Sequence, residues 1–193
     1  MARIHSVAVF CGSHMGDDPV FRAAATGLGQ ALAGEGMRLV YGGGRVGLMG
    51  AVADGAVAAG GTVIGVIPEF LRRAEVAHEG LSELIVTEDM HTRKRRMFEL
   101  SDAFVSFPGG LGTLDETFEI LTWRQLRLHD KPIVICDINR SAGPLLALME
   151  AVIGAGFARP DVREYYAVTR GIAETMELLR RTAAREGGRT ALL

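Results

Sequence analysis

Short apolar runs alternate with helical patterns along this chain, and this alternation restricts its fold more than any other feature. A strand followed by a helix and a further strand makes a crossover connection, and repeated crossovers favour a parallel sheet. We therefore predict an α/β fold with a doubly wound parallel sheet and helices on both faces. The expected strands are 4–10, 38–41, 62–67, 84–87, 103–107 and 132–136.

Start and stop signals place helices between these strands. Asp18-Pro19 combines an N-cap residue with proline at the first helical position, which predicts a helix from residue 19 to about Gly34. A second helix, 47–59, is rich in alanine and glycine, a composition that suits close packing on a sheet. Further helices are expected at about 90–100, 114–128, 144–153 and 171–179, with a flexible tail after residue 185.

Length and charge narrow the class of protein. The 193 residues, of which 48% are hydrophobic, suffice for a single domain, 1–193, and are too few for two ordinary domains. A formal net charge of −2 argues against a general nucleic-acid binder. No apolar run approaches the roughly 18 residues of a membrane span, and the first residues lack a signal-peptide core. We expect a cytoplasmic protein with no membrane partner.

Cysteines and histidines give no sign of a disulfide or a metal site. Cys11 and Cys136 each follow an apolar run, which favours reduced, buried thiols. The five histidines are scattered along the chain. We expect no bound metal.

The stretch from Pro108 to Glu116 contains the strongest functional signal. Its sequence is Pro-Gly-Gly-Leu-Gly-Thr-Leu-Asp-Glu, between a buried strand and a helix whose inward face carries Leu114, Phe118 and Leu121. The free N–H groups and positive dipole end of a helix N-terminus can hold a phosphate if no side chains obstruct them. The glycines at 109, 110 and 112 meet that condition.

Glycines also follow the first two expected strands, in Cys11-Gly-Ser13 and in 42–44. Ligands of doubly wound sheets bind at the carboxyl ends of the strands, so the three loops are expected to converge on one crevice. Each loop alone is as well explained by a tight turn. A rival signal is Gly42-Gly-Gly-Arg-Val-Gly47, which satisfies the dinucleotide pattern, with Glu69 placed to meet a ribose.

Glu116 has a structural alternative to a catalytic role. Thr113-Leu-Asp-Glu116 matches a capping box, in which Thr113 caps the helix and Glu116 bonds back to its N–H. Asp115, Glu116 and Glu119 nevertheless place three carboxylates within two helical turns, beside the expected anion. A cation is therefore expected nearby.

The basic segment 90–97 is the expected source of that cation. In a helix, Met90 and Met97 share a buried stripe that Arg93 and Lys94 flank, whereas Arg95 points away. A solvated basic face is the common alternative. A run of cations near a helix N-terminus interacts unfavourably with the helix dipole. A bound anion would offset this energetic cost, which a solvated face would leave unexplained.

These residues resemble the LOG family, the cytokinin riboside 5′-monophosphate phosphoribohydrolases, whose members have often carried the label lysine decarboxylase. The resemblance covers roughly residues 5 to 180 and rests on Pro108-Gly-Gly-x-Gly-Thr-x-x-Glu116 together with Met90-His-x-Arg-Lys94. The supporting motifs are Cys11-Gly-Ser13, Tyr41-Gly-Gly-Gly44, Gly47-Leu-Met-Gly50, Ile67-Pro-Glu69, Leu121-Thr-Trp123-x-Gln125 and His129-Asp-Lys-Pro132.

The resemblance implies a Rossmann-like fold, a homodimer with the active site near its interface, and no cofactor. It implies hydrolysis of the N-glycosidic bond of adenine-type nucleoside monophosphates to free base and ribose 5-phosphate. By position, Arg93 and Glu116 are the expected catalytic pair. The expected substrate contacts are Ser13, Gly43, Glu75, Met90, Lys94, Gly109, Gly110, Leu111, Gly112, Thr113, Asp115 and Thr122.

Some of these positions have simpler explanations or depart from the family pattern. Ser13 can cap a turn, Thr122 can bond back to its own helix, and Glu75 can be a surface charge. Asp115 replaces a glutamate of many relatives, which keeps the charge and shortens the reach, and His14 replaces a small polar residue.

Three other functions are compatible with parts of the sequence. A lysine decarboxylase needs a lysine that holds pyridoxal phosphate, and the chain has only Lys94 and Lys131. An AMP nucleosidase performs the same hydrolysis on plain AMP. A non-catalytic nucleotide carrier or sensor uses the crevice only to bind.

Overall fold

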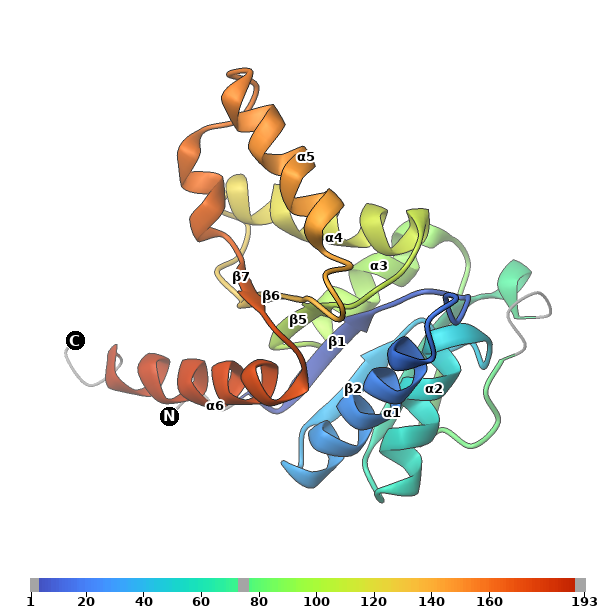
Figure 1. Cartoon of the computed structure of the whole chain (residues 1–193). Helices are drawn as coiled ribbons and strands as arrows, with labels where there is room; N and C mark the ends of the chain where they lie inside the picture. Colours follow the sequence, from blue (N-terminus) through green and yellow to red (C-terminus); the bar gives the residue numbers. More distant parts are fainter. Residues whose placement is uncertain (1–3, 73–76, 190–193) are drawn as a thin grey trace.

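The computed structural model describes residues 4–72 and 77–189, and its strands form one parallel sheet (Figure 1). The strand order is β4-β3-β2-β1-β5-β6-β7, with every neighbouring pair parallel. This arrangement confirms the predicted α/β fold. The strands are β1 (Ser6–Phe10), β2 (Arg38–Tyr41), β3 (Val63–Pro68), β4 (Glu83–Thr87), β5 (Ala103–Ser106), β6 (Ile133–Cys136) and β7 (Ala167–Thr169).

The direction of winding reverses between β1 and β5. The chain first builds β2, β3 and β4 outward on one side of β1, then returns and builds β5, β6 and β7 on the other. Val7 of β1 is in register with Ala103 of β5, and Phe10 with Ser106. The loops that leave two such strands lead to helices on opposite faces of the sheet, and a crevice forms between them at the carboxyl ends of the strands.

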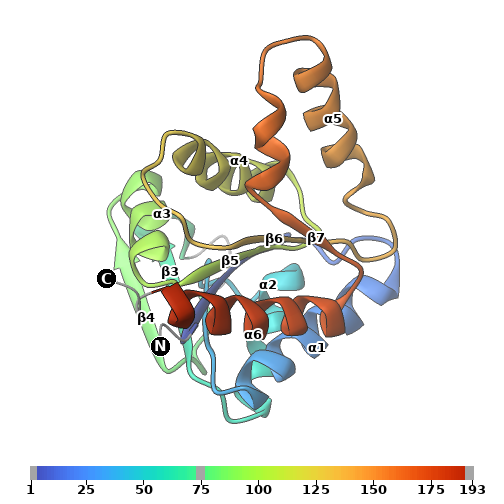
Figure 2. The same cartoon turned by 90° about the vertical axis from the view of Figure 1, so that its left-hand side faces the viewer.

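Helices cover both faces of the sheet (Figures 1 and 2). One face carries α1, α2 and α6, and the other carries α3, α4 and α5. The helices are α1 (Pro19–Gly34), α2 (Gly47–Ala58), α3 (Met90–Glu99), α4 (Leu111–Gln125), α5 (Gly143–Gly154) and α6 (Ile172–Arg189), with short 3-10 turns at Glu69–Leu71 and Pro160–Glu164.

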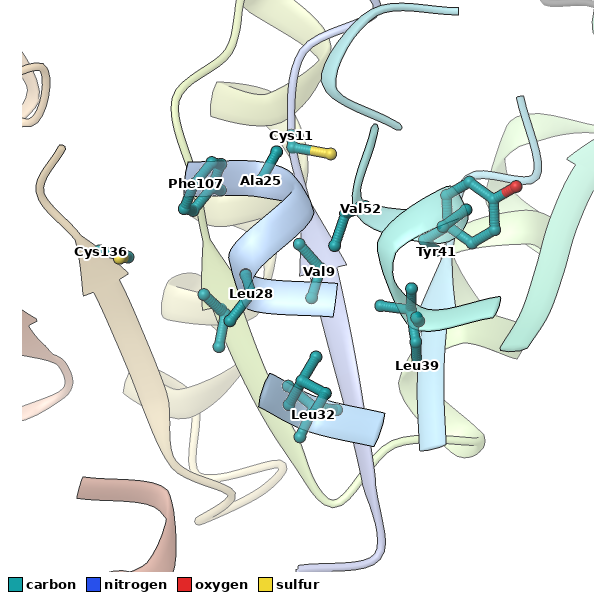
Figure 3. Close-up of a cluster of buried hydrophobic side chains, with 14 of the residues drawn as sticks. Val9, Cys11, Ala25, Leu28, Leu32, Leu39, Tyr41, Val52, Phe107 and Cys136 are labelled. Carbon is teal, nitrogen blue, oxygen red and sulfur yellow. The ribbon is translucent and has the colours of Figure 1, made fainter. Parts of the chain in front are cut away.

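The hydrophobic core lies in two layers, one on each face of the sheet. Every residue of β1 is buried, as expected for a central parallel strand with helices on both sides. Figure 3 shows the layer beneath α1, where Leu28 and Leu32 lie against Val9 of β1 and Leu39 of β2. Cys11 and Cys136 are free and buried, as predicted.

Glycines allow α1 and α2 to approach each other closely. A Cβ atom on Gly29 would collide with the Val52 backbone, and one on Gly55 would collide with the Thr26 carbonyl. The prediction that the small residues of α2 serve packing on the sheet was therefore incomplete, because Gly55 of α2 serves a helix–helix contact.

The structure differs from the predictions in a missed strand, one helix start and one helix end. Strand β7 was missed because its three residues are too few to show alternation. Helix α4 begins at Leu111, three residues before the predicted start, because Gly112 and Thr113 join its first turn. Helix α6 continues to Arg189, well past the predicted end near Leu179, while residues 190–193 of the expected tail lie outside the described part of the chain.

Candidate active site

A cavity of about 610 Å³ lies at the carboxyl ends of β1 and β5, where the winding reverses. This is the position that the fold favours for a ligand. Its walls come from the loops after β1, β5 and β6 and from the N-terminal parts of α1, α2, α3 and α4. The lining residues are Cys11, Gly12, Ser13, His14, Met15, Gly16, Phe21, Leu48, Met49, Met90, Arg93, Pro108, Gly109, Gly110, Leu111, Gly112, Thr113, Glu116 and Ser141.

Direct backbone contact joins the loops after β1 and β5. The Gly12 amide donates a hydrogen bond to the Pro108 carbonyl at 3.0 Å. A Cβ atom on Gly12 would lie 3.2 Å from the Gly109 Cα atom, and one on Gly109 would lie 2.8 Å from the Gly12 amide nitrogen. Glycine at both positions is therefore what lets the two loops meet, and the predicted convergence of these loops is confirmed.

The N-terminus of α4 opens into the cavity without a side-chain cap. Gly110 is the N-cap residue, and no side chain there accepts a hydrogen bond from the helix. A Cβ atom on Gly110 or Gly112 would have no neighbour within 4 Å, so the space beside the first turn is open. The first N–H groups of a helix lack intrahelical partners and favour an anion. The turn thus has the form expected of a phosphate site.

The capping-box interpretation of Glu116 is wrong. Thr113 is the third residue of α4 and is buried, so it cannot be the N-cap. Glu116 lies one turn further along the helix and lines the cavity. The error arose because the glycines made the helix start look later than it is.

Arg93 is held rigidly in the cavity wall. The side chain is buried, its Nε donates to the Val66 carbonyl at 3.0 Å, and its Nη2 donates to the Gly42 carbonyl at 3.1 Å. Its Nη1 lies 3.7 Å from the Met90 sulfur. A Cβ atom on Gly42 would collide with the guanidinium. One carbonyl of β3 and one from the residue that follows β2 thus fix the position of this positive charge.

Glu116 and Arg93 both act on the same buried thiol. Burial raises the pKa of Cys11, the negative charge of Glu116 raises it further, and the positive charge of Arg93 opposes the rise. The thiol therefore stays protonated and is a poor nucleophile. The two charges that act on it belong to the predicted catalytic pair, which comes together at the cavity although the residues lie on different helices.

Lys94 faces inward, as predicted, but does not line the large cavity. Its ammonium lies 3.1 Å from a carboxylate oxygen of Asp115 and 3.1 Å from one of Glu119. Burial lowers the pKa of Lys94, but the hydrogen bonds and charges of Asp115 and Glu119 outweigh burial and leave that pKa above its ordinary value. Arg95 is exposed, also as predicted.

The other predicted contacts that the structure describes either line the cavity or lie away from it. Ser13, Met90 and Leu111 line the cavity, as does the turn 109–113. Gly43, at φ +78°, packs against Ile67 and Leu84 and does not line it. Thr122 bonds back to the Phe118 carbonyl at 2.7 Å and borders a separate apolar groove, and Glu75 lies outside the described residues.

The dinucleotide interpretation of 42–47 does not fit the structure. The Leu48 and Met49 amides at the start of α2 point to the Gly12 carbonyl, at 3.0 and 3.3 Å, so a protein group occupies the place of a pyrophosphate. Gly47 abuts the Ser13 backbone, and the Glu69 carboxylate pairs with Arg72 on the surface. The second loop reaches the cavity only through Leu48 and Met49.

Several lining residues were not predicted. Met15 and Phe21 follow β1 and give the cavity an apolar side, and Ser141 follows β6. Ser141 could have been predicted from the rule that ligands bind at the carboxyl ends of the strands. Gly42 was missed as the partner of Arg93, because no sequence pattern links two residues 51 positions apart. Within 4–72 and 77–189, no group of three or more potential ligands could hold a metal ion, and no helix is long and apolar enough to cross a membrane.

Comparison with known proteins identifies the family of this chain. A family model described as "Possible lysine decarboxylase" matches residues 49–179. A cytokinin riboside 5′-monophosphate phosphoribohydrolase of Rhodococcoides fascians is 48% identical over 176 residues, 91% of this chain and 89% of that protein. The chain belongs to the LOG family. A LOG-family phosphoribohydrolase of Arabidopsis thaliana is 39% identical over 92% of this chain and 78% of its own length.

Solved structures support the fold. A molybdenum cofactor binding protein from Rippkaea orientalis superposes with a TM-score of 0.71 at 23% identity, covering 94% of this chain and 99% of that one. A molybdenum cofactor carrier protein from Chlamydomonas reinhardtii gives 0.71 at 23% identity, covering 95% and 99%. At this identity the likeness shows a shared Rossmann-like fold and no more.

The lysines of this LOG-family chain do not suit pyridoxal phosphate. Neither lysine lines the large cavity. Lys94 is held between two carboxylates, and Lys131 donates to the Phe98 carbonyl at 2.8 Å while lying over the Phe98 ring. A Schiff-base lysine must reach its cofactor, so these contacts count against the decarboxylase label.

Proposed function

We propose that this protein hydrolyses the N-glycosidic bond of cytokinin riboside 5′-monophosphates, with AMP as a further substrate. The observation that carries the proposal is that Arg93 and Glu116 line the same cavity as the open N-terminus of α4. The names of relatives that align with most of this chain support the same reaction.

The substrate phosphate is proposed to lie against the turn from Gly109 to Thr113, with Ser13 and Met90 as further contacts of the substrate. Backbone N–H groups and the helix dipole favour the phosphate dianion there. Glu116 follows the turn on the same helix and also lines the cavity. A phosphate on the turn therefore brings the ribose toward this carboxylate.

In the proposed reaction, the bond between C1′ and the base nitrogen breaks and its electron pair leaves with the base. The transition state resembles an oxocarbenium ion, which the Glu116 carboxylate stabilises while it orients the attacking water. The water oxygen bonds to C1′, one water proton passes to the departing base, and free base and ribose 5-phosphate result.

Arg93 is proposed to supply a fixed positive charge rather than a proton. A guanidinium stays protonated at ordinary pH, so it is a poor general acid. Its two bonds to backbone carbonyls fix its orientation before substrate binds. Such preorganised charge stabilises developing negative charge on a leaving group or holds the phosphate at little reorganisation cost.

Incubation of the purified protein with AMP and with isopentenyladenosine monophosphate tests the proposal. We expect free base and ribose 5-phosphate in equal amounts, measured by chromatography. If both nucleotides bind by calorimetry but neither is cleaved, the protein is a carrier or sensor. Cleavage of AMP alone would make it an AMP nucleosidase without a cytokinin role.

We also propose a homodimer formed through α4 and α5. An apolar groove of about 270 Å³ lies there, and Leu148 and Phe157 beside it are 51% and 88% exposed. Apolar surface of this kind is typical of interfaces. Thr122 borders the groove, so any contact between Thr122 and a nucleotide is proposed to occur in the partner's cavity.

Light scattering after size exclusion tests the dimer. Phe157→Asp is expected to give a monomer, whereas Val57→Asp, at an exposed position of α2, is expected to leave the dimer intact. A Phe157→Asp variant that stays dimeric would contradict this interface.

A further inference from the structure

Lys94 bridges the two helices that carry the proposed catalytic residues. It follows Arg93 on α3, and it binds Asp115 and Glu119 on α4, the residues immediately before and three after Glu116. Both ion pairs measure 3.1 Å. The Lys94 side chain is only 12% exposed, so solvent screens these charges less than those of a surface pair.

The same region contains a second attachment between the helices. The Phe98 ring near the end of α3 meets the Trp123 ring of α4 edge-on, at 5.0 Å between centroids. Both rings border a small cavity that Lys94, Glu116 and Glu119 also line. An apolar contact near the end of α3 and an ionic contact at its middle thus hold it against α4, beside β5 (Figures 1 and 2).

Without Lys94, the repulsion among neighbouring carboxylates of α4 would be unfavourable. Asp115, Glu116 and Glu119 place three carboxylates within two turns of α4. Like charges that share a site repel each other and favour protonation of one of them. Lys94 lies between two of these carboxylates and borders the same small cavity as Glu116.

We propose that Lys94 and Glu119 form a clamp that fixes α3 against α4 and thereby sets the position of Arg93 relative to Glu116. Lys94 and Glu119 are then positioning residues, and Lys94 is not a contact of the substrate phosphate. Asp115 supports the clamp from its exposed side. The kinetic consequences rest on the proposed function, whereas the ion pair itself does not.

Kinetics of Lys94→Met, Glu119→Gln and the double variant test the clamp. Each single change is expected to lower kcat about tenfold to a hundredfold, because small misplacements of catalytic groups cost that much. KM and the Kd of ribose 5-phosphate, measured by calorimetry, should change less than about threefold. The double variant should be no worse than either single one. Lys94→Arg should retain most of kcat, since it keeps the charge between the two carboxylates.

The pH profile separates positioning from a merely structural role. Glu116 is surrounded by Arg93 and Cys11 at the large cavity, by Lys94 and Glu119 at the small one, and by Asp115 beside it in α4. Lys94→Met leaves the carboxylates without their cation, so the acid limb of kcat/KM should move to higher pH. Adding Glu119→Gln should move the limb back toward that of the unchanged protein.

Glu99→Gln is the matched control. Glu99 pairs with Arg96 on the exposed side of α3, so its loss removes a carboxylate away from the clamp and should leave kcat unchanged. A tenfold rise in the Kd of ribose 5-phosphate for Lys94→Met, with Glu119→Gln unaffected, would overturn the proposal and make Lys94 a phosphate contact. Unchanged kcat in Lys94→Met would also overturn it.

The clamp can be tested even if the protein cleaves no nucleotide. The proposed function would then be wrong. The free energies of unfolding of the unchanged protein, Lys94→Met, Glu119→Gln and the double variant still give the coupling energy between Lys94 and Glu119. A favourable coupling supports the clamp independently of catalysis. A coupling of zero contradicts it.

Discussion

The guanidinium of Arg93 occupies the space that a side chain on Gly42 would fill. Its Nη2 donates to the Gly42 carbonyl at 3.1 Å, and any Cβ atom on Gly42 would collide with it. Gly42 lines no part of the cavity, yet it determines where the charge of Arg93 lies.

Gly42→Ala should therefore displace Arg93 and lower kcat by about tenfold to a hundredfold, as expected when a catalytic group moves by an ångström or less. Steady-state kinetics of nucleotide hydrolysis check this. Gly34→Ala at the end of α1 is the control, because its Cβ would meet nothing within 4 Å. Normal kcat in Gly42→Ala would show that the position of Arg93 is not critical.

Arg93→Lys should lose activity and stability together. A single ammonium cannot reproduce the two bonds to Val66 and Gly42, and a buried carbonyl left without a partner costs about 1–3 kcal/mol. Urea unfolding measures that loss. The exposed Arg95→Lys should unfold like the unchanged protein.

Glu116→Gln should abolish turnover with little change in stability. The helix is capped by Gly110 and not by a Thr113–Glu116 box, so no cap is lost, and an isosteric amide keeps the packing. We expect a loss of kcat of at least about a hundredfold, the usual contribution of a positioned acid–base group. A large fall in melting temperature with activity retained would instead favour a structural role.

Two glycines of the turn should respond differently to alanine. Gly109→Ala places a methyl group 2.8 Å from the Gly12 amide nitrogen and against Thr113, so it should destabilise the protein and weaken binding. Gly110→Ala meets open space and should change stability by less than about 0.5 kcal/mol. If phosphate binds this turn, Gly110→Ala still raises KM, because the methyl group enters the phosphate site.

The N-cap of α3 should give a pH-dependent contribution to stability. Hydrogen bonds from the Thr92 amide and side chain lower the pKa of Asp89 from 3.8. The unfolded chain therefore takes up the proton first as pH falls, and stability that is full above the ordinary pKa is lost as pH drops through the lower folded value. Urea unfolding between pH 6 and 2 should show the advantage over Asp89→Asn shrinking below about pH 4, since asparagine caps well at any pH. An advantage that is constant with pH would contradict this.

The sequence predicted most elements of the fold because their signals are local. Asp18-Pro19 marks the start of α1 within the sequence itself, and six of the strands are apolar runs that a buried parallel sheet requires. The same local signals failed where glycine hides a helix start, as at Leu111, and where a strand is only three residues long, as at Ala167–Thr169.

By itself, the sequence determined the alternation of strands and helices, the glycine turn at the start of α4, the inward direction of Arg93 and Lys94, and the family. Tertiary structure alone decided that Arg93 binds the Gly42 and Val66 carbonyls, that Lys94 pairs with Asp115 and Glu119, and that Thr122 borders another surface. Periodicity and capping depend on neighbours within a few residues. These contacts join residues 21 to 51 positions apart, and only the packing of helices on the sheet brings them together.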